Sequence, residues 1–91
     1  MDRKPIGDDA IVSAMDEMWV ALRRRLKEKG RGTFASKHEI MAIIDEEIDE
    51  VHDAVRMHGD ANHEQLAKEL KDVAVGAIFG LACIRSGTID W

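Results

Sequence analysis

The sequence predicts an all-α protein built around a helical hairpin of about three helices. Three observations favour this class. Apolar residues recur at steps of three and four along three segments. The composition favours helix over sheet, with few aromatic residues, a single Pro and much Ala, Leu, Ile, Met, Glu and Lys. The chain of 91 residues has room for one domain, so we expect a single domain over 1–91 with tails at 1–8 and 86–91.

The first helix is expected from about Asp9 to Lys29. Asp8 or Asp9 can cap its start, and the glycines of "GRG" at 30–32 end it. Charge along the helix runs from acidic to basic, which complements the helix dipole. The apolar stripe predicted to face the core consists of Ile11, Met15, Met18, Trp19, Leu22 and Leu26.

The second helix has a strong start signal. In "SKHE", Ser36 can accept a bond from a free backbone N–H while Glu39 reaches back, which is a capping box. Phe34 or Ala35 can pack over this start. We expect the helix to run to Met57 or His58, with Gly59 as the residue that ends it.

The third helix is expected from the weaker signal "NHEQ" at Asn62 to about Arg85, followed by the tail "SGTIDW". The short link "HGDAN" predicts that the second and third helices form an antiparallel hairpin. Gly76 and Gly80 either let another helix approach closely or are simply tolerated inside a buried helix.

The acidic stretch "DEEIDEVHDAV" at 45–55 divides by helical geometry. Ile48, Val51 and Val55 recur at helical spacing, so one side should be buried. At about 100° per residue, Glu47 lies within the apolar stripe and Glu50 at its edge. The remaining acids of the stretch are expected on the solvated face, namely Asp45, Asp49 and Asp53.

The third helix repeats this pattern. Glu69 lies between apolar residues, and Asp72 lies at the edge of the stripe. The facing sides of a hairpin would bring both i, i+3 pairs together, and two carboxylates about 6 Å apart repel by roughly 3 kcal/mol at an effective dielectric near 20. Lys68 and Lys71 are expected to point sideways or away from Glu69. A hard divalent cation, Mg²⁺ or Mn²⁺, would neutralise the four acids, although a Glu at the edge of a stripe can also reach solvent.

The spacing of these acids also resembles a known signature. "EEIDE" at 46–50, followed after 18 residues by "ELKD" at 69–72, resembles the EExxE…ExxD motif of MazG-like all-α nucleoside triphosphate pyrophosphohydrolases. The segment "FASKHE" is similar to one in small phage-type members. The resemblance covers about 33–84.

The resemblance implies a Mg²⁺-dependent hydrolase, with Mn²⁺ as a possible substitute, that cleaves (d)NTPs between the α- and β-phosphates to a monophosphate and pyrophosphate. It implies metal ligation by Glu47, Glu50, Glu69 and Asp72. Glu46 would help hold a further ion or the attacking water, and Glu46 and Glu47 would be the catalytic pair. Such an enzyme would cleanse the nucleotide pool.

Substrate contacts are less sharply indicated. Phosphates need cationic partners, for which Lys37, Arg56, Lys68 and Lys71 are candidates. Trp19, Phe34 and His38 could stack on a base, although Trp19 also lies on the expected core stripe. The basic run 23–25 is either a solvated face or an attractor for triphosphates. The substrate-binding set carried forward is Lys37, His38, Lys71 and Trp19.

Composition bounds the partners. The net charge of −5 does not favour a nucleic-acid partner. The longest apolar run, Val73 to Ile84, is shorter than the roughly 20 residues that span a bilayer, and no signal peptide is visible, so we expect a cytoplasmic protein. The lone Cys83 is expected in the core.

The expected assembly is a homodimer or homotetramer. Many members of the resembled family have a fourth helix, whereas this chain has only "SGTIDW" after its third, so apolar surface would be left to cover. An alternative from another class is a non-catalytic helical oligomerisation module, of phage or mobile-element type, with a vestigial metal site.

Overall fold

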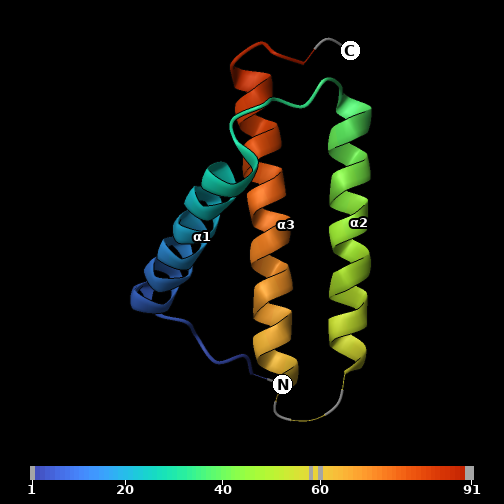
Figure 1. Cartoon of the computed structure of the whole chain (residues 1–91). Helices are drawn as coiled ribbons and strands as arrows, with labels where there is room; N and C mark the ends of the chain where they lie inside the picture. Colours follow the sequence, from blue (N-terminus) through green and yellow to red (C-terminus); the bar gives the residue numbers. More distant parts are fainter. Residues whose placement is uncertain (1, 58, 60, 90–91) are drawn as a thin grey trace.

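The computed structural model describes residues 2–57, 59 and 61–89 and consists of three helices, as the sequence predicts (Figure 1). Helix α1 spans Asp8–Lys29, α2 spans Lys37–Arg56 and α3 spans Ala61–Arg85. No strand occurs among the described residues. The all-α three-helix prediction is confirmed.

Helix α3 is the centre of the bundle. It packs against α2 along an antiparallel hairpin and against α1 on another side, whereas α1 and α2 make no close backbone contact with each other (Figure 1). Each outer helix therefore has only α3 as a helical neighbour. No described helix is both long enough and apolar enough to cross a membrane.

The start of α2 matches the predicted capping box in part. The Ser36 hydroxyl accepts a hydrogen bond from the backbone N–H of Glu39 at 3.2 Å, and Ser36 is buried. The helix ends at Arg56, one residue before the earlier of the two predicted ends. Gly59 has a φ of +98°, which favours glycine, while His58 lies outside the described residues.

Two predicted caps are wrong. Gly7, not Asp8 or Asp9, occupies the cap position of α1, and both acids lie in the first helical turn, where they still complement the dipole. Asn62 lies inside α3. Its side-chain amide donates to the carbonyls of Ala54 and Met57 at 2.8 and 2.9 Å, so it caps the end of α2 instead.

The C-terminal tail folds back over the end of α3. The hydroxyls of Ser86 and Thr88 both donate to the carbonyl of Cys83, at 2.9 and 3.1 Å. Ile89 packs against the core, and Asp90 and Trp91 lie outside the described residues.

The core lies where the α1–α2 connection crosses α3. Phe34 and Phe79 meet edge to face with centroids 5.1 Å apart, and Cys83 is buried beside them, as predicted for this cysteine. The partly buried residues around this group are Leu26, Ile40, Ile43 and Ile89.

The predicted apolar stripe of α1 is wrong over its first half. Leu22 is buried and Met18 and Leu26 are partly buried, but Trp19 is 55% exposed and Met15 60% exposed. Ile11 is also exposed. The reason is that α1 contacts only α3, and one helical neighbour covers a narrower strip than the sequence offers.

Smaller corrections apply to the hairpin. Ile48 and Val55 are exposed, although their helical spacing predicts that they lie on a buried side. The stripe around Glu47 is confirmed, because Ile43, Ile44 and Val51 are all at least partly buried.

Candidate metal centre

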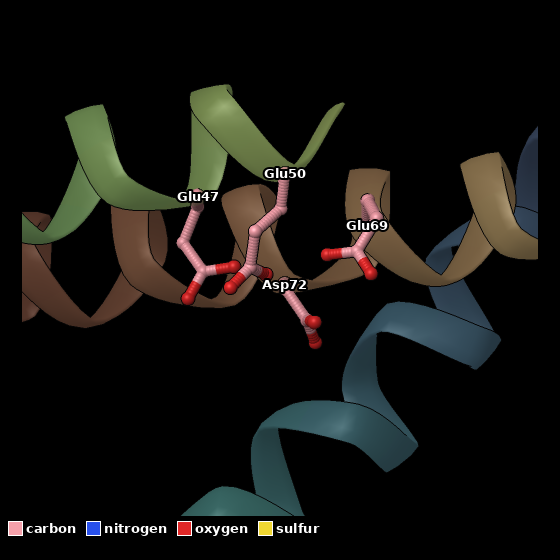
Figure 2. Close-up of side chains that lie close together, drawn as sticks. All are labelled: Glu47, Glu50, Glu69 and Asp72. Carbon is pink, nitrogen blue, oxygen red and sulfur yellow. The ribbon is translucent and has the colours of Figure 1, made fainter. Parts of the chain in front are cut away.

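Four carboxylates from two helices meet in the middle of the hairpin (Figure 2). One carboxylate oxygen from each residue lies within 4.8 Å of those of the other three. The cluster comprises Glu47 and Glu50 from α2 and Glu69 and Asp72 from α3. The sequence-based expectation that both i, i+3 pairs face one another is confirmed for these four residues.

Close packing of α2 on α3 brings the pairs together. A Cβ added at Gly80 would lie only 3.1 Å from Cγ2 of Ile40, and one at Gly76 would lie 3.9 Å from Cγ2 of Ile43. The helix that the two glycines admit is therefore α2 of the same chain. Because α2 occupies this position, the two glycines do not indicate close packing of a helix from a second subunit.

The four carboxylates differ in burial. Glu69 is only 4% exposed, Glu47 and Asp72 are partly buried, and Glu50 is exposed. Oε2 of Glu47 and Oε2 of Glu69 are buried without a hydrogen-bond partner. A buried carboxylate oxygen without a partner is costly, and a cation or a hydrogen-bond donor at these two atoms would offset that cost.

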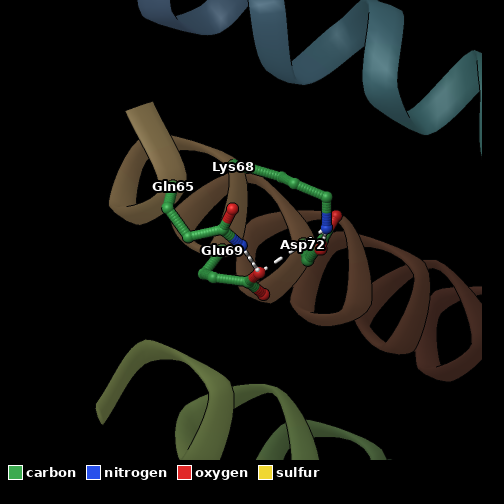
Figure 3. Close-up of polar contacts among 4 residues, drawn as sticks. All are labelled: Gln65, Lys68, Glu69 and Asp72. Carbon is green, nitrogen blue, oxygen red and sulfur yellow. Dashed lines mark hydrogen bonds and ion pairs between the residues drawn. The ribbon is translucent and has the colours of Figure 1, made fainter. Parts of the chain in front are cut away.

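Two side chains of α3 contact oxygens of the cluster, one as a neutral hydrogen-bond donor and the other as a cation (Figure 3). Nε2 of Gln65 donates to Oε1 of Glu69 at 2.6 Å. Nζ of Lys68 lies 3.1 Å from Oδ2 of Asp72 and 3.5 Å from Oε1 of Glu69. The expectation that Lys68 points away from Glu69 is therefore wrong, because its long side chain bends toward both acids.

The proximity of the acids changes their protonation. Burial, followed by the charge of Asp72, raises the pKa of Glu47 above its usual value. A hydrogen bond to Glu69, followed by the charge of Glu47, raises the pKa of Glu50 to about 7. Near neutral pH the cluster therefore retains part of its protons unless a cation displaces them.

The donor set fits a hard metal ion. All four ligands are carboxylate oxygens, with no thiolate or imidazole in the cluster, and two of the oxygens are buried and unpartnered. Oxygen-only sites suit Mg²⁺, Mn²⁺ or Ca²⁺ better than Zn²⁺. The cluster could therefore bind a metal ion through Glu47, Glu50, Glu69 and Asp72.

A cavity of about 330 Å³ adjoins the cluster. Glu46, Glu47 and Asp72 line one side, and Arg24 and Arg25 of α1 line the other. The cavity is completed by Ala21, Glu28, Lys29, Ile43, Val75 and Gly76. Glu46 itself is exposed, and it belongs to the site because it lines this cavity.

The sequence alone does not show whether Arg24 and Arg25 lie on a solvated face or beside a binding site. A run of three basic residues on a surface helix is usually solvated, and nothing in the local pattern separates Arg24 and Arg25 from Arg23. Their place beside the acids follows from how α1 lies on α3. The charge of the run was the only available signal.

The residues predicted to bind substrate do not line this cavity. Lys37 and His38 lie in the first turn of α2, about 14 Å along the helix axis from Glu47 at 1.5 Å per residue. Lys71 forms an ion pair with Glu17 of α1 at 3.5 Å. Trp19 is exposed under the guanidinium of Arg23, which lies 5.8 Å from the ring centroid.

Comparison of the chain with protein-family models, with curated proteins and with solved structures gave no significant match.

Proposed function

We propose that the protein is a Mg²⁺-dependent nucleotide pyrophosphohydrolase that cleaves (d)NTPs to a nucleoside monophosphate and pyrophosphate. One observation carries this proposal: four carboxylates converge within 4.8 Å, and two of them have buried oxygens without a partner. The resemblance of their spacing to EExxE…ExxD supports the choice of reaction.

Glu47, Glu50, Glu69 and Asp72 would hold Mg²⁺, with Mn²⁺ as a substitute. When bound, the ion supplies Lewis-acid chemistry, neutralising phosphate charge and lowering the pKa of a bound water. A triphosphate could not otherwise approach four clustered acids, because like charges repel.

The chain's other residues have distinct tasks in this proposal. Glu46 lines the cavity next to Glu47, and in this proposal it would hold the attacking water and accept its proton. Gln65 holds the carboxylate of Glu69 in position through the 2.6 Å hydrogen bond to Oε1. Lys68 balances Asp72 and Glu69 when no cation is bound.

The proposed enzyme works as a homodimer or homotetramer on the cytoplasmic nucleotide pool. The exposed apolar residues of α1 support assembly, because an isolated small domain gains stability by covering such surface.

The test is a panel of canonical and modified (d)NTPs assayed for pyrophosphate release with Mg²⁺. We expect release from at least one nucleotide and none with Glu47→Gln, which removes a ligand charge without changing shape. The matched control is Asp49→Asn on the exposed face of the same helix. Absence of pyrophosphate from every nucleotide would refute the enzymatic proposal.

A second candidate function is a non-catalytic helical oligomerisation module with a vestigial metal site. The exposed apolar side chains of α1 favour it, since Ile11, Val12 and Met15 lie in the open. Titration with Mg²⁺ or Mn²⁺ during thermal unfolding separates the two, because only a ligand of the folded state raises the midpoint. A raised midpoint without turnover would indicate metal binding without catalysis.

A further inference from the structure

One face of α1 is directed at the carboxylate cluster. The residues of α1 that line the cavity or pair across to α3 are Glu17, Ala21, Arg24, Arg25, Glu28 and Lys29. They recur at steps of one, three and four, which is one side of a helix. The ion pair between Glu17 and Lys71 ties this face to α3 one turn beyond the cavity.

The cations on this face are available to a ligand. Arg24 and Lys29 form no ion pair with any described residue. Arg25 is fixed differently, since its guanidinium carbon lies 3.9 Å from the ring centroid of Phe79 and 5.7 Å from that of Phe34. The α1 side of the cavity thus carries three cations and one acid, Glu28, a net positive charge, and the other side carries Glu46, Glu47 and Asp72.

This distribution of charge fits a polyphosphate. Guanidinium groups bind phosphate oxygens in a bidentate manner, whereas the acids opposite can meet phosphate only through a metal ion. The volume of about 330 Å³ lies at the low end of the range for small-molecule pockets, roughly 300–1,000 Å³. It therefore suits a phosphate chain better than an entire nucleotide. Figure 2 shows the α1 ribbon on the side toward which Glu47 and Asp72 point.

We propose that Arg24 and Lys29, with Arg25 held on Phe79, form a polyphosphate subsite that binds the phosphate chain between α1 and the carboxylate cluster. The inference rests on the proposed function for its metal ion but assigns new residues. Arg24 is the best residue to test, because it is exposed and its loss should leave the fold intact, whereas Arg25 also supports the core.

The experiment measures binding of inorganic pyrophosphate by calorimetry in the presence of saturating Mn²⁺. We expect Arg24→Ala to weaken binding by about tenfold to a hundredfold, the usual effect of losing a charge-assisted contact. Arg24→Lys should recover part of the affinity. Binding of Mn²⁺ alone should not change, since Arg24 is no metal ligand.

The matched control is Arg23→Ala, which removes the same charge from the adjacent residue, outside the lining of this cavity. An equal loss in both variants would reduce the effect to general electrostatics and overturn the subsite. Failure of the native protein to bind pyrophosphate would overturn it as well.

A nucleotide assay on the same variants separates this inference from the proposed function. If the native protein releases pyrophosphate from a (d)NTP and Arg24→Ala has the KM of Arg23→Ala, the subsite is wrong and the function stands. If no nucleotide is hydrolysed but pyrophosphate binding depends on Arg24, the subsite stands and the function is wrong.

Discussion

The hairpin of α2 and α3 and the separate helix α1 use apolar residues in opposite ways. In the hairpin, Gly76 and Gly80 let Ile43 and Ile40 of α2 pack closely on α3, and Glu69 is buried. Helix α1 contacts α3 alone and leaves Met15 and Trp19 exposed. The hairpin therefore carries all four acids of the cluster, whereas α1, which packs on α3 alone, contributes the cations that line the cavity.

The largest expected effect breaks the hairpin. Gly80→Val would place a β-branched side chain where even a Cβ meets Cγ2 of Ile40 at 3.1 Å. We expect a loss of about 1–3 kcal/mol in unfolding free energy, from overpacking, together with weaker metal binding. Denaturant unfolding measures the first and calorimetry the second.

The control for that variant is Gly76→Ala, where the added Cβ has ordinary contact with Ile43 at 3.9 Å. Alanine is the better helix former by about 0.8–1 kcal/mol, so stability should hold or rise. Equal destabilisation of both variants would contradict the inference that α2 packs more closely on α3 at Gly80 than at Gly76.

The next effect separates the destabilisation caused by the clustered acids from the stabilisation that a bound metal ion would provide. Without metal, Glu47→Gln should leave the protein as stable as the native form or more so, because one buried charge is removed. At a free Mg²⁺ concentration of about 100 times Kd, the unfolding free energy of the native protein should rise by about 2.7 kcal/mol. The variant should gain only a small part of that amount. Thermal unfolding with and without Mg²⁺ measures both. An unchanged response of the variant to Mg²⁺ would remove Glu47 from the ligand set.

A smaller effect concerns how the hairpin is closed. The amide of Asn62 donates to two carbonyls at the end of α2, so Asn62→Ala should lose about 1 kcal/mol of unfolding free energy. Equilibrium denaturation is the measurement, and Asn62→Asp, which cannot donate, should behave similarly. If Asn62→Ala were as stable as the native protein, water would replace the amide fully at both carbonyls, and the cap would not contribute to stability.

The metal-free protein should also lose stability as pH rises. The folded state raises the pKa of Glu47 and Glu50, the latter to about 7, so it binds more protons than the unfolded chain above pH 4.5. Their contribution is therefore complete below about pH 4.5 and is lost as pH rises toward 7.

Thermal midpoints in a chelator at about pH 5.5 and about pH 8 test this dependence. Glu50→Gln should flatten it, and saturating Mg²⁺ should oppose it, because the ion binds the deprotonated cluster. A thermal midpoint that rises with pH in the chelator would contradict the raised pKa values of Glu47 and Glu50.

The smallest effect on the monomer is expected on the open side of α1. Met15 is 60% exposed, and Gln has a similar helix propensity, so Met15→Gln should change unfolding free energy by less than about 0.5 kcal/mol. If this side joins subunits, the variant should dissociate at concentrations where the native protein is a dimer or tetramer. Sedimentation measures the outcome, and a native protein that is monomeric throughout would refute the proposed assembly.

The sequence by itself determined the three helices and the position of each acid on its helix. Helical spacing is local, so the place of Glu47 and Glu69 within apolar stripes could be read without knowing the fold. The short link then predicted the hairpin that brings both pairs together.

Only the tertiary structure decided which surfaces α1 uses. Its apolar stripe is wider than the strip that α3 can cover, so the pattern alone could not show that Trp19 stays exposed while Arg24 and Arg25 line a cavity. The reach of Lys68 to Asp72 and of Asn62 to α2 likewise depends on side-chain length and on neighbours distant in sequence. Periodicity gives the direction of a residue around its own helix, whereas packing between helices decides what that residue meets.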